Sequence, residues 1–290
     1  MINDIQLDPS CAFLDIPLQG ESVRFRQWGA LQGSRAVILL VHGLGAHGAW
    51  FEGAARELMK RGYLVLAYDQ RGFGDRASLP VNSYNEWIGD LAAIVKHFRQ
   101  AFNQLPLYLL GNSMGALVVM GASKGLDVDG IVICSPGFDG HPQAFSTAYK
   151  INAIFSALFA PNRIVNLPYN LDRVTRVEAV RRFIINDQFK KMAVPGSMLL
   201  QLLKLSRSVL ASLKQVHVPV LMITAGQEKV VDNVVNLKVF ERLAAPSKKH
   251  IEMTEAWHDL MFDPLVDEVA DEISTWQSSL AKNHSMAVPK

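Results

Sequence analysis

The sequence predicts an α/β fold in which helices cover both faces of a mostly parallel sheet. Two observations support this prediction. Continuous apolar segments of strand length alternate with helical segments over residues 35–135, and the alternation resumes at residue 219. Between them the pattern is mostly helical, with proline and glycine breaks. We therefore expect a core formed by residues 1–138 and 219–290, with a helical cap, or lid, formed by residues 139–218 between two core strands.

The predicted core strands are apolar at nearly every position. A strand covered on both faces has this pattern, whereas a strand with one solvated face alternates apolar and polar residues. Residues 22–28 alternate and predict a half-buried strand. The apolar segments are residues 35–41, 63–69, 106–111, 128–135 and 219–226, and residues 248–255 are expected to form a further strand.

The segments between these strands have apolar residues three and four positions apart, which places them on one face of a helix. In residues 85–102, Trp87, Leu91 and Phe98 belong to such a face. The predicted core helices are residues 49–62, residues 85–102, a helix that begins at Ser113, residues 233–244 and residues 264–280.

Composition indicates a folded protein, since 49% of the 290 residues are hydrophobic and 19% are charged. The N-terminal residues show no signal-peptide pattern, and no apolar run reaches the ~20 residues of a membrane-spanning helix. Cys11 and Cys134 have no metal-ligand spacing. We expect a cytoplasmic protein that needs no metal or organic cofactor.

Charge is unevenly distributed along the chain. The net charge of +2 gives no indication of a nucleic-acid partner. However, residues 139–218 contain eleven basic and four acidic residues, so this segment has a charge of +7 and the rest of the chain −5. The segment also contains two strongly apolar stretches, residues 151–160 and 197–205. Either it lies on an anionic lipid surface, with the protein peripherally bound, or its basic residues pair with the acidic core.

The sequence Gly111-Asn112-Ser113-Met114-Gly115 matches the G-x-S-x-G pattern of a nucleophile elbow. An apolar strand precedes it and a helix follows it, as that turn requires. The glycines permit close approach of strand and helix, while the helix N-terminus favours negative charge near Ser113. The context predicts Ser113 as a nucleophile, the alternative being an ordinary strand-to-helix turn.

A serine nucleophile needs hydrogen-bond donors for the oxyanion that forms during its attack. The loop His42-Gly43-Leu44-Gly45 follows the strand at residues 35–41. We expect the backbone N–H groups of Leu44 and Met114 to form this oxyanion hole. His42 is expected to make structural hydrogen bonds rather than to act as a base.

The base and the acid should follow the serine, because the chain order behind such an elbow is serine, acid, histidine. His258 lies just after the last predicted strand and is the expected base, whereas His250 lies within that strand. Two carboxylates follow residues 219–226, Glu228 and Asp232. We favour Glu228 because it is nearer the strand end, and because Asp232 is placed to cap the next helix.

Together the motifs HGLGAHG, YDQRGFG, GNSMGA, GQEKVVDN and AWHDLMFDP resemble the monoacylglycerol lipase and lysophospholipase group of α/β-hydrolases. The resemblance covers roughly residues 30–135 and 219–280. It implies the α/β-hydrolase fold, Ser113 and His258 as nucleophile and base, and a helical cap. The chain departs from the group at the acidic residue. The group usually has an aspartate there, one residue further from the glycine that ends the preceding strand. The longer side chain of Glu228 compensates for a shorter loop.

These expectations define a serine esterase that hydrolyses a single-chain lipid ester, either a monoacylglycerol or a lysophospholipid, through an acyl-enzyme on Ser113. Fold does not fix substrate, so two alternatives stay open. One is a carboxylesterase or thioesterase acting on small soluble esters. The other is a non-catalytic ligand-binding protein. The sequence gives no indication of oligomeric state.

Overall fold

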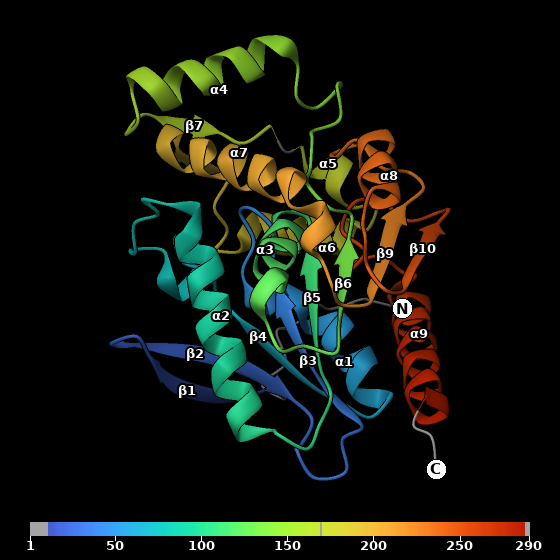
Figure 1. The fold of residues 1–290 in the computed structure, drawn as a ribbon. Coiled ribbons are helices and arrows are strands. Elements are labelled where there is room, and N and C mark those ends of the chain that lie inside the picture. Colours follow the sequence, from blue (N-terminus) through green and yellow to red (C-terminus); the bar gives the residue numbers. More distant parts are fainter. Residues whose placement is uncertain (1–10, 169, 288–290) are drawn as a thin grey trace.

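The computed structural model describes residues 11–168 and 170–287, and its core is an eight-stranded sheet (Figure 1). The strand order is β1-β2-β4-β3-β5-β6-β9-β10. Neighbours from β4 to β10 run parallel, whereas β1 and β2 pair antiparallel. The predicted mostly parallel sheet is therefore confirmed. The strands are β1 (Ala12–Leu18), β2 (Glu21–Trp28), β3 (Ala36–Val41), β4 (Tyr63–Tyr68), β5 (Leu107–Asn112), β6 (Gly130–Cys134), β7 (Ile164–Asn166), β8 (Ala193–Pro195), β9 (Val220–Ala225) and β10 (Lys248–Met253).

Helices cover both faces of the sheet. Helices α2, α3 and α8 pack against one face, and α1 and α9 against the other. The helices are α1 (Glu52–Lys60), α2 (Tyr84–Ala101), α3 (Met114–Ala122), α4 (Thr147–Phe159), α5 (Leu171–Val174), α6 (Glu178–Asn186), α7 (Gly196–Ala211), α8 (Asn233–Glu241) and α9 (Val266–Ala287). Short 3₁₀ helices are η1 (Gly48–Phe51), η2 (Gly74–Arg76), η3 (Ser123–Gly125) and η4 (Leu213–Gln215).

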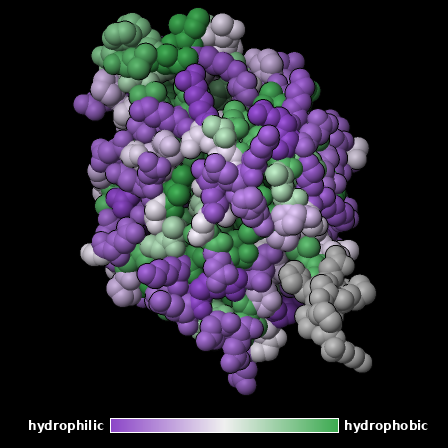
Figure 2. Space-filling model, viewed as in Figure 1, coloured by the Kyte–Doolittle hydropathy of each residue, from purple (hydrophilic) through white to green (hydrophobic). Residues whose placement is uncertain are grey.

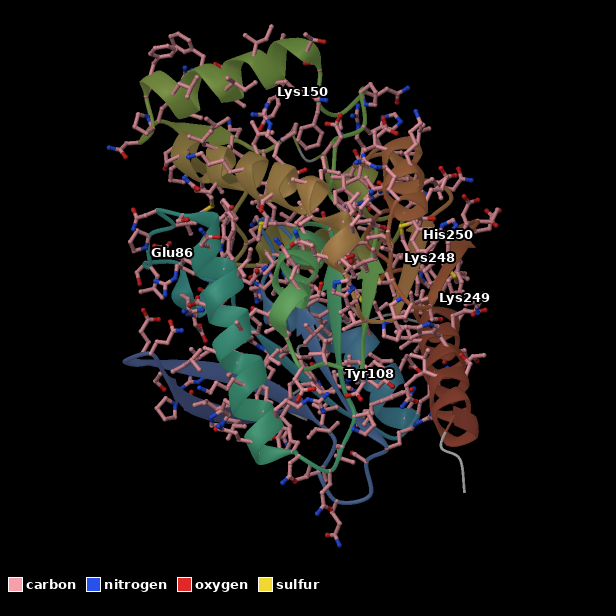
Figure 3. All side chains as sticks on the ribbon, in the orientation of Figure 1. Glu86, Tyr108, Lys150, Lys248, Lys249 and His250 are labelled. Atoms are coloured by element: carbon pink, nitrogen blue, oxygen red, sulfur yellow. The ribbon has the colours of Figure 1, made fainter. Side chains whose placement is uncertain are left out.

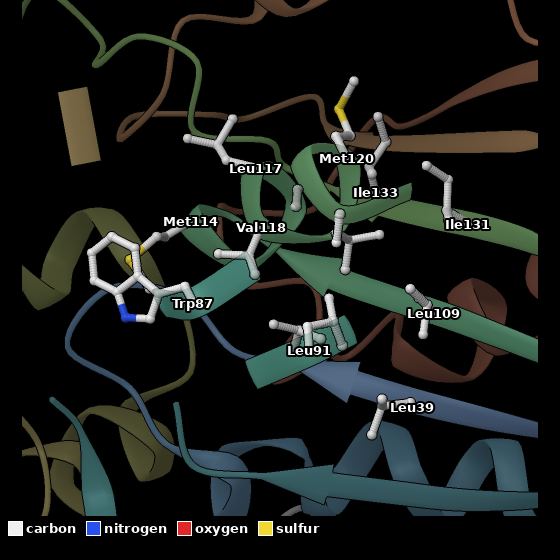
Figure 4. Close-up of a cluster of buried hydrophobic side chains, with 14 of the residues drawn as sticks. Leu39, Trp87, Leu91, Leu109, Met114, Leu117, Val118, Met120, Ile131 and Ile133 are labelled. Atoms are coloured by element: carbon white, nitrogen blue, oxygen red, sulfur yellow. The ribbon is translucent and has the colours of Figure 1, made fainter. Parts of the chain in front are cut away.

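The central strands are apolar throughout because alternate side chains enter two different cores. In β3, Leu39 belongs to the core beneath α2 and α3, whereas Ile38 and Leu40 belong to the core beneath α1 and α9. Figure 4 shows part of the first core, where Trp87 and Leu91 of α2 lie near the buried residues of α3. This burial fixes α3, and with it the turn that precedes the helix.

The segment between β6 and β9 contains α4 to α7. Helix α7 packs against α3, and α4 lies on the outer side of α7, above the carboxyl ends of the parallel strands (Figure 1). The sequence predicted the helices but not the two-stranded sheet formed by β7 and β8. In the described residues, no helix is long and apolar enough to span a bilayer.

Strand β1 was not predicted either. It pairs with β2 at the edge of the sheet through a turn at Gln19 and Gly20, whose φ angles are 48° and 88°. Most of its side chains are exposed, and Pro17 is tolerated at an edge because that position needs no inward N–H donor. An exposed edge strand lacks the apolar signal of the central strands.

The fold predicts that α9 contributes strongly to stability through Trp276, which is buried and packs edge-on against Tyr108. Trp276→Ala should lower the free energy of unfolding by about 3–5 kcal/mol, because it leaves a large cavity. Urea denaturation followed by circular dichroism measures this change. The exposed neighbour Thr275 provides the control Thr275→Ala, and an equal midpoint for both variants would contradict the prediction.

Candidate active site

Ser113 occupies the turn between β5 and α3 in a strained backbone conformation. Its φ angle is +54°, a region that non-glycine residues occupy at a cost of about 1–3 kcal/mol. Two backbone hydrogen bonds hold it: the Ser113 N–H donates to the Cys134 carbonyl at 2.9 Å, and the Gly137 N–H donates to the Ser113 carbonyl at 3.2 Å. The end of β6 therefore holds the turn in place.

The two glycines of the motif are required by close backbone contacts. A Cβ atom on Gly115 would lie 2.0 Å from the Val41 carbonyl oxygen, and one on Gly111 would lie 2.4 Å from the Gly115 carbonyl oxygen. Any side chain would separate α3 from β3 and β5. The turn matches the nucleophile elbow predicted from the sequence.

The loop after β3 lies against Ser113. A Cβ atom on Gly43 would be 3.2 Å from the Cβ of Ser113 and 3.8 Å from its Oγ. Met114 is the first residue of α3, so its N–H has no acceptor within the helix. Leu44 and Met114 both line a cavity that Ser113 also lines. Both residues that carry the predicted oxyanion donors thus lie beside the serine, at the same cavity.

Glu228 and His258 form a buried ion pair. The His258 Nδ1 lies 3.0 Å from Oε1 and 2.9 Å from Oε2 of Glu228. Oε1 also accepts backbone N–H groups from Lys229, Val230 and Val231 at 3.0, 2.7 and 3.2 Å. These donors fix the carboxylate, which in turn orients the imidazole.

The pair changes the proton affinities of both partners. Burial raises the pKa of Glu228, but the charge and hydrogen bond of His258 and the backbone donors outweigh it, so the pKa is lowered. Burial likewise lowers the pKa of His258, but the charge and hydrogen bond of Glu228 raise it more, so its pKa lies above the usual range. The arrangement stabilises a protonated imidazole, as a general base requires.

The other carboxylate considered from the sequence, Asp232, lies at the start of α8. Its Oδ1 accepts the N–H groups of Val234 and Val235 at 2.9 and 3.3 Å, which is the geometry of a helix cap. The structure therefore brings Glu228, not Asp232, to His258.

The two other histidines considered lie in structural positions. The Nδ1 of His42 lies 2.8 Å from the Gly43 carbonyl oxygen, and its Nε2 accepts the Gln70 N–H at 2.9 Å. Burial lowers the pKa of His42 to about 4, so it stays neutral, which agrees with the structural role expected for it. His250 lies on β10 at the outer edge of the sheet, near Lys248 and Lys249 (Figure 3), and contacts Thr224.

Two cavities meet at Ser113. The smaller, of about 40 Å³, is also lined by His258 and contains Asn112 and Asp259 in its wall. The larger, of about 370 Å³, extends between α4 and α7 and is mostly apolar. Its lining includes Phe145, Tyr149, Ala153, Ile154, Ala157, Leu158, Leu199, Leu200, Leu202 and Leu203.

Sequence reasoning did not identify Asn112 or Asp259 as part of the site. Both flank residues that were singled out, since Asn112 precedes Ser113 and Asp259 follows His258. Their proximity in sequence was a signal, but only the fold shows that both residues line the same cavity.

The segment of residues 139–218 is joined to the loop after β3 by direct hydrogen bonds. The Lys191 N–H donates to the Gly45 carbonyl at 2.8 Å. Asp187 lies 2.7 Å from the His47 Nε2 and accepts the Trp50 Nε1–H at 2.7 Å. These bonds hold the segment close to the predicted oxyanion loop.

Few of the segment's basic residues pair with the core. In the described part of the chain, Arg176 is the one that forms an ion pair with a carboxylate outside the segment, at 2.9 Å from Asp263. Lys150 and Arg181 pair with carboxylates of the segment itself. Charge pairing with the core therefore accounts for little of the segment's excess positive charge.

Comparison with known proteins identifies relatives across the chain. The family model described as serine aminopeptidase, S33 (Hydrolase_4) matches residues 32–265. The chain is 27% identical to Phospholipase YtpA of Bacillus subtilis over 81% of this chain and 92% of that protein. It is 24% identical to the monoglyceride lipase of Homo sapiens over 97% of this chain and 96% of that protein.

A solved structure agrees in fold. A soluble variant of monoglyceride lipase from Saccharomyces cerevisiae, in complex with a substrate analog, superposes with a TM-score of 0.84 at 19% identity, covering 94% of this chain and 96% of that one. The turn at Ser113, the mostly parallel sheet and the family match all indicate an α/β-hydrolase. The chain belongs to the Hydrolase_4 family of serine hydrolases, within the monoacylglycerol lipase and lysophospholipase group of α/β-hydrolases.

Proposed function

We propose that this enzyme hydrolyses a lipid ester with a single acyl chain, a monoacylglycerol or a lysophospholipid, through an acyl-enzyme on Ser113. The observation that carries the proposal is the position of Ser113 between two cavities. On one side it shares a cavity with His258, which Glu228 orients. On the other side it adjoins the large apolar cavity.

Each proposed role follows from position. The Ser113 Oγ attacks the ester carbonyl while His258 accepts its proton, and Glu228 stabilises the resulting imidazolium. The N–H groups of Leu44 and Met114 stabilise the oxyanion. The alcohol leaves with a proton from His258, and a water molecule activated by the same imidazole releases the fatty acid.

The large cavity suits an acyl chain. Its wall is formed by side chains of α4 and α7, so we propose that residues 139–218 act as a cap, or lid, over the core of residues 1–138 and 219–290. Each buried methylene contributes about 0.8 kcal/mol, so a long chain gains much more than a short one. Lipid esters are also the substrates named by the monoglyceride lipase and phospholipase relatives.

The proposal predicts a preference for long acyl chains. Dodecanoyl esters should have a kcat/KM at least ten times that of butanoyl esters with the same alcohol, because the additional methylenes enter the apolar cavity. A panel of monoacylglycerols, lysophospholipids and p-nitrophenyl esters measures this preference. Selective hydrolysis of the short soluble esters would favour the small-ester alternative.

Covalent labelling of the serine separates an enzyme from a binding protein. A fluorophosphonate probe should label the wild type and not Ser113→Ala. Ser123→Ala is the matched control, since Ser123 is also buried but bonds to the Met120 carbonyl on the far end of α3. Absence of labelling in the wild type would support a non-catalytic protein.

The acid assignment predicts unequal effects of two substitutions. Glu228→Gln should lower kcat by a factor of about 10²–10⁴, because the imidazolium loses its buried counter-charge. Asp232→Asn removes a helix cap and should change kcat less than threefold. Steady-state kinetics of both variants measures the difference, and a larger loss in Asp232→Asn would reverse the assignment.

The pH profile provides a second readout of the same pair. Because Glu228 raises the pKa of His258, wild-type kcat/KM should fall with acid around a midpoint above 6.5. Removing the carboxylate charge lowers that pKa, so the midpoint in Glu228→Gln should move to lower pH. An unchanged midpoint would show that Glu228 does not raise the pKa of His258.

We also propose that α4 makes peripheral contact with anionic lipid. Figure 2 shows apolar residues gathered over this helix at the upper left. Exposed apolar side chains on it are Ile151, Ile154, Phe155, Leu158 and Phe159, of which Phe159 is 73% exposed. The positive charge of the segment, little of it paired with the core, favours an anionic surface.

Co-sedimentation with liposomes tests this contact. The wild type should bind phosphatidylglycerol vesicles at low salt and less at high salt, since the electrostatic attraction is screened. Phe155→Ser/Phe159→Ser should bind at least fivefold more weakly, because two exposed apolar side chains are lost. Phe13→Ser is the control, because Phe13 is an exposed phenylalanine on β1, outside the segment. No binding at low salt would refute the contact.

A further inference from the structure

The backbone on either side of His258 is held by hydrogen bonds that involve the segment of residues 139–218. The residue after His258, Asp259, donates its N–H to the Val174 carbonyl oxygen at 3.1 Å. Val174 is buried and is the last residue of α5. Because a buried backbone N–H needs an acceptor, this bond ties the chain immediately after His258 to the segment.

The residue before His258 is held by a buried carboxylate. The Trp257 N–H donates to Oδ2 of Asp263 at 3.2 Å, and the Leu265 N–H donates to Oδ1 at 3.1 Å. Asp263 is 1% exposed, so water contributes little to the stabilisation of its charge. A buried carboxylate of this kind needs a cation as well as hydrogen-bond donors.

Arg176 of the segment supplies that cation. Its Nε donates to Oδ2 of Asp263 at 3.2 Å, and its Nη2 donates to Oδ1 at 2.9 Å. The planar guanidinium therefore binds both carboxylate oxygens and fixes the orientation of the carboxylate, which an ammonium group does less well. Oδ2 accepts from both Arg176 and the Trp257 N–H, so a single oxygen atom joins the arginine to the residue before His258.

The same stretch of the segment also contacts the loop that carries Glu228. Val174 belongs to a buried cluster with Val230 and Val231. The N–H groups of these two valines donate to Oε1 of Glu228 at 2.7 and 3.2 Å. Residues 174–176 therefore contact the supports of both the proposed acid and the proposed base.

From these contacts we propose that Arg176 is a positioning residue for the proposed base. Through Asp263 it holds the backbone before His258, so that the imidazole stays between Glu228 and Ser113. The inference rests on the proposed function and adds a residue to it. Proton transfer needs the imidazole within hydrogen-bond reach of the serine Oγ, and a displacement of about 1 Å lowers the rate by as much as about 10²-fold.

The alternative is a purely structural role for Arg176. Asp263 lies just before α9, and the bond from its Oδ1 to the Leu265 N–H resembles a helix cap. Arg176 would then only neutralise this carboxylate. A structural role lowers the thermal stability and leaves the kcat of the folded enzyme unchanged, whereas a positioning role lowers kcat with little change in KM.

Steady-state hydrolysis of p-nitrophenyl butyrate tests the proposal, because this short ester does not need to fill the large apolar cavity. Arg176→Gln should lower kcat by about tenfold to a hundredfold and change KM by less than about twofold. Arg173→Gln is the matched control and should change kcat by less than about twofold. Arg173 lies in the same segment, but it donates to the Gln143 carbonyl oxygen within that segment. Circular dichroism shows whether each variant is folded at the assay temperature.

The conservative substitution Arg176→Lys provides a second test, which also applies if Arg176→Gln fails to fold. It keeps the positive charge but cannot bind both carboxylate oxygens in the same way, so kcat should fall by only about threefold.

The rate of labelling by a fluorophosphonate probe provides a third test. Arg176→Gln should slow this reaction by about tenfold when His258 is present. The residual labelling of His258→Ala should not change when Arg176→Gln is added, because the arginine acts through the imidazole.

Two results would overturn the inference and retain the proposed function. One is a wild-type kcat in every folded Arg176 variant. The other is an equal slowing of labelling with and without the His258 imidazole, since the effect would then not pass through the base. Labelling of His258→Ala as fast as that of the wild type would instead reject the proposed base, and the positioning role with it.

Discussion

The close approach of β3, β5 and α3 is the constraint on which the site depends. No side chain fits at Gly111 or Gly115, because backbone carbonyl groups occupy the space where a Cβ would lie. That contact forces the chain to turn within one residue, and Ser113 takes the strained φ of +54°. The buried packing of α3 and the hydrogen bonds to Cys134 and Gly137 offset the strain.

The position of the turn also determines what surrounds it. The carboxyl ends of β3, β5, β9 and β10 lie on the same side of the sheet because these strands run parallel. The loops that follow them therefore supply the residues around Ser113 from distant parts of the sequence. The placement of Ser113 between the core loops and α7 explains why it adjoins both cavities.

Much of the core could be predicted from the sequence, because central strands buried on both faces are apolar at nearly every position. Leu39 and Ile38 illustrate this, as neighbours that enter different cores. Strand β1 lacked this signal since it lies at an edge and is mostly exposed. The pair β7 and β8 was missed because three residues carry too little pattern to stand out among helices.

The proposed site, like the fold, has parts that could be predicted from the sequence and parts that could not. The elbow was predictable because its glycines follow a steric rule, and His258 because of its place after the last strand. The proximity of Glu228 to His258 depends on loop geometry, which the sequence indicated only through the distance from a strand end. The large cavity depends on how α4 and α7 pack over the core, which the sequence does not indicate. That Asn112 and Asp259 line the smaller cavity likewise became visible only in the fold.

The hydrogen bond from Lys191 to Gly45 gives the predicted oxyanion loop a support in the overlying segment, in addition to the core strand β3 that precedes the loop. A Cβ on Gly45 would lie 2.6 Å from the Lys191 carbonyl oxygen, so the two backbones are in direct contact. The segment is therefore not an interchangeable module. Grafting a different covering segment onto this core would have to reproduce the backbone around Lys191, or the loop that carries Leu44 would lose its outer support.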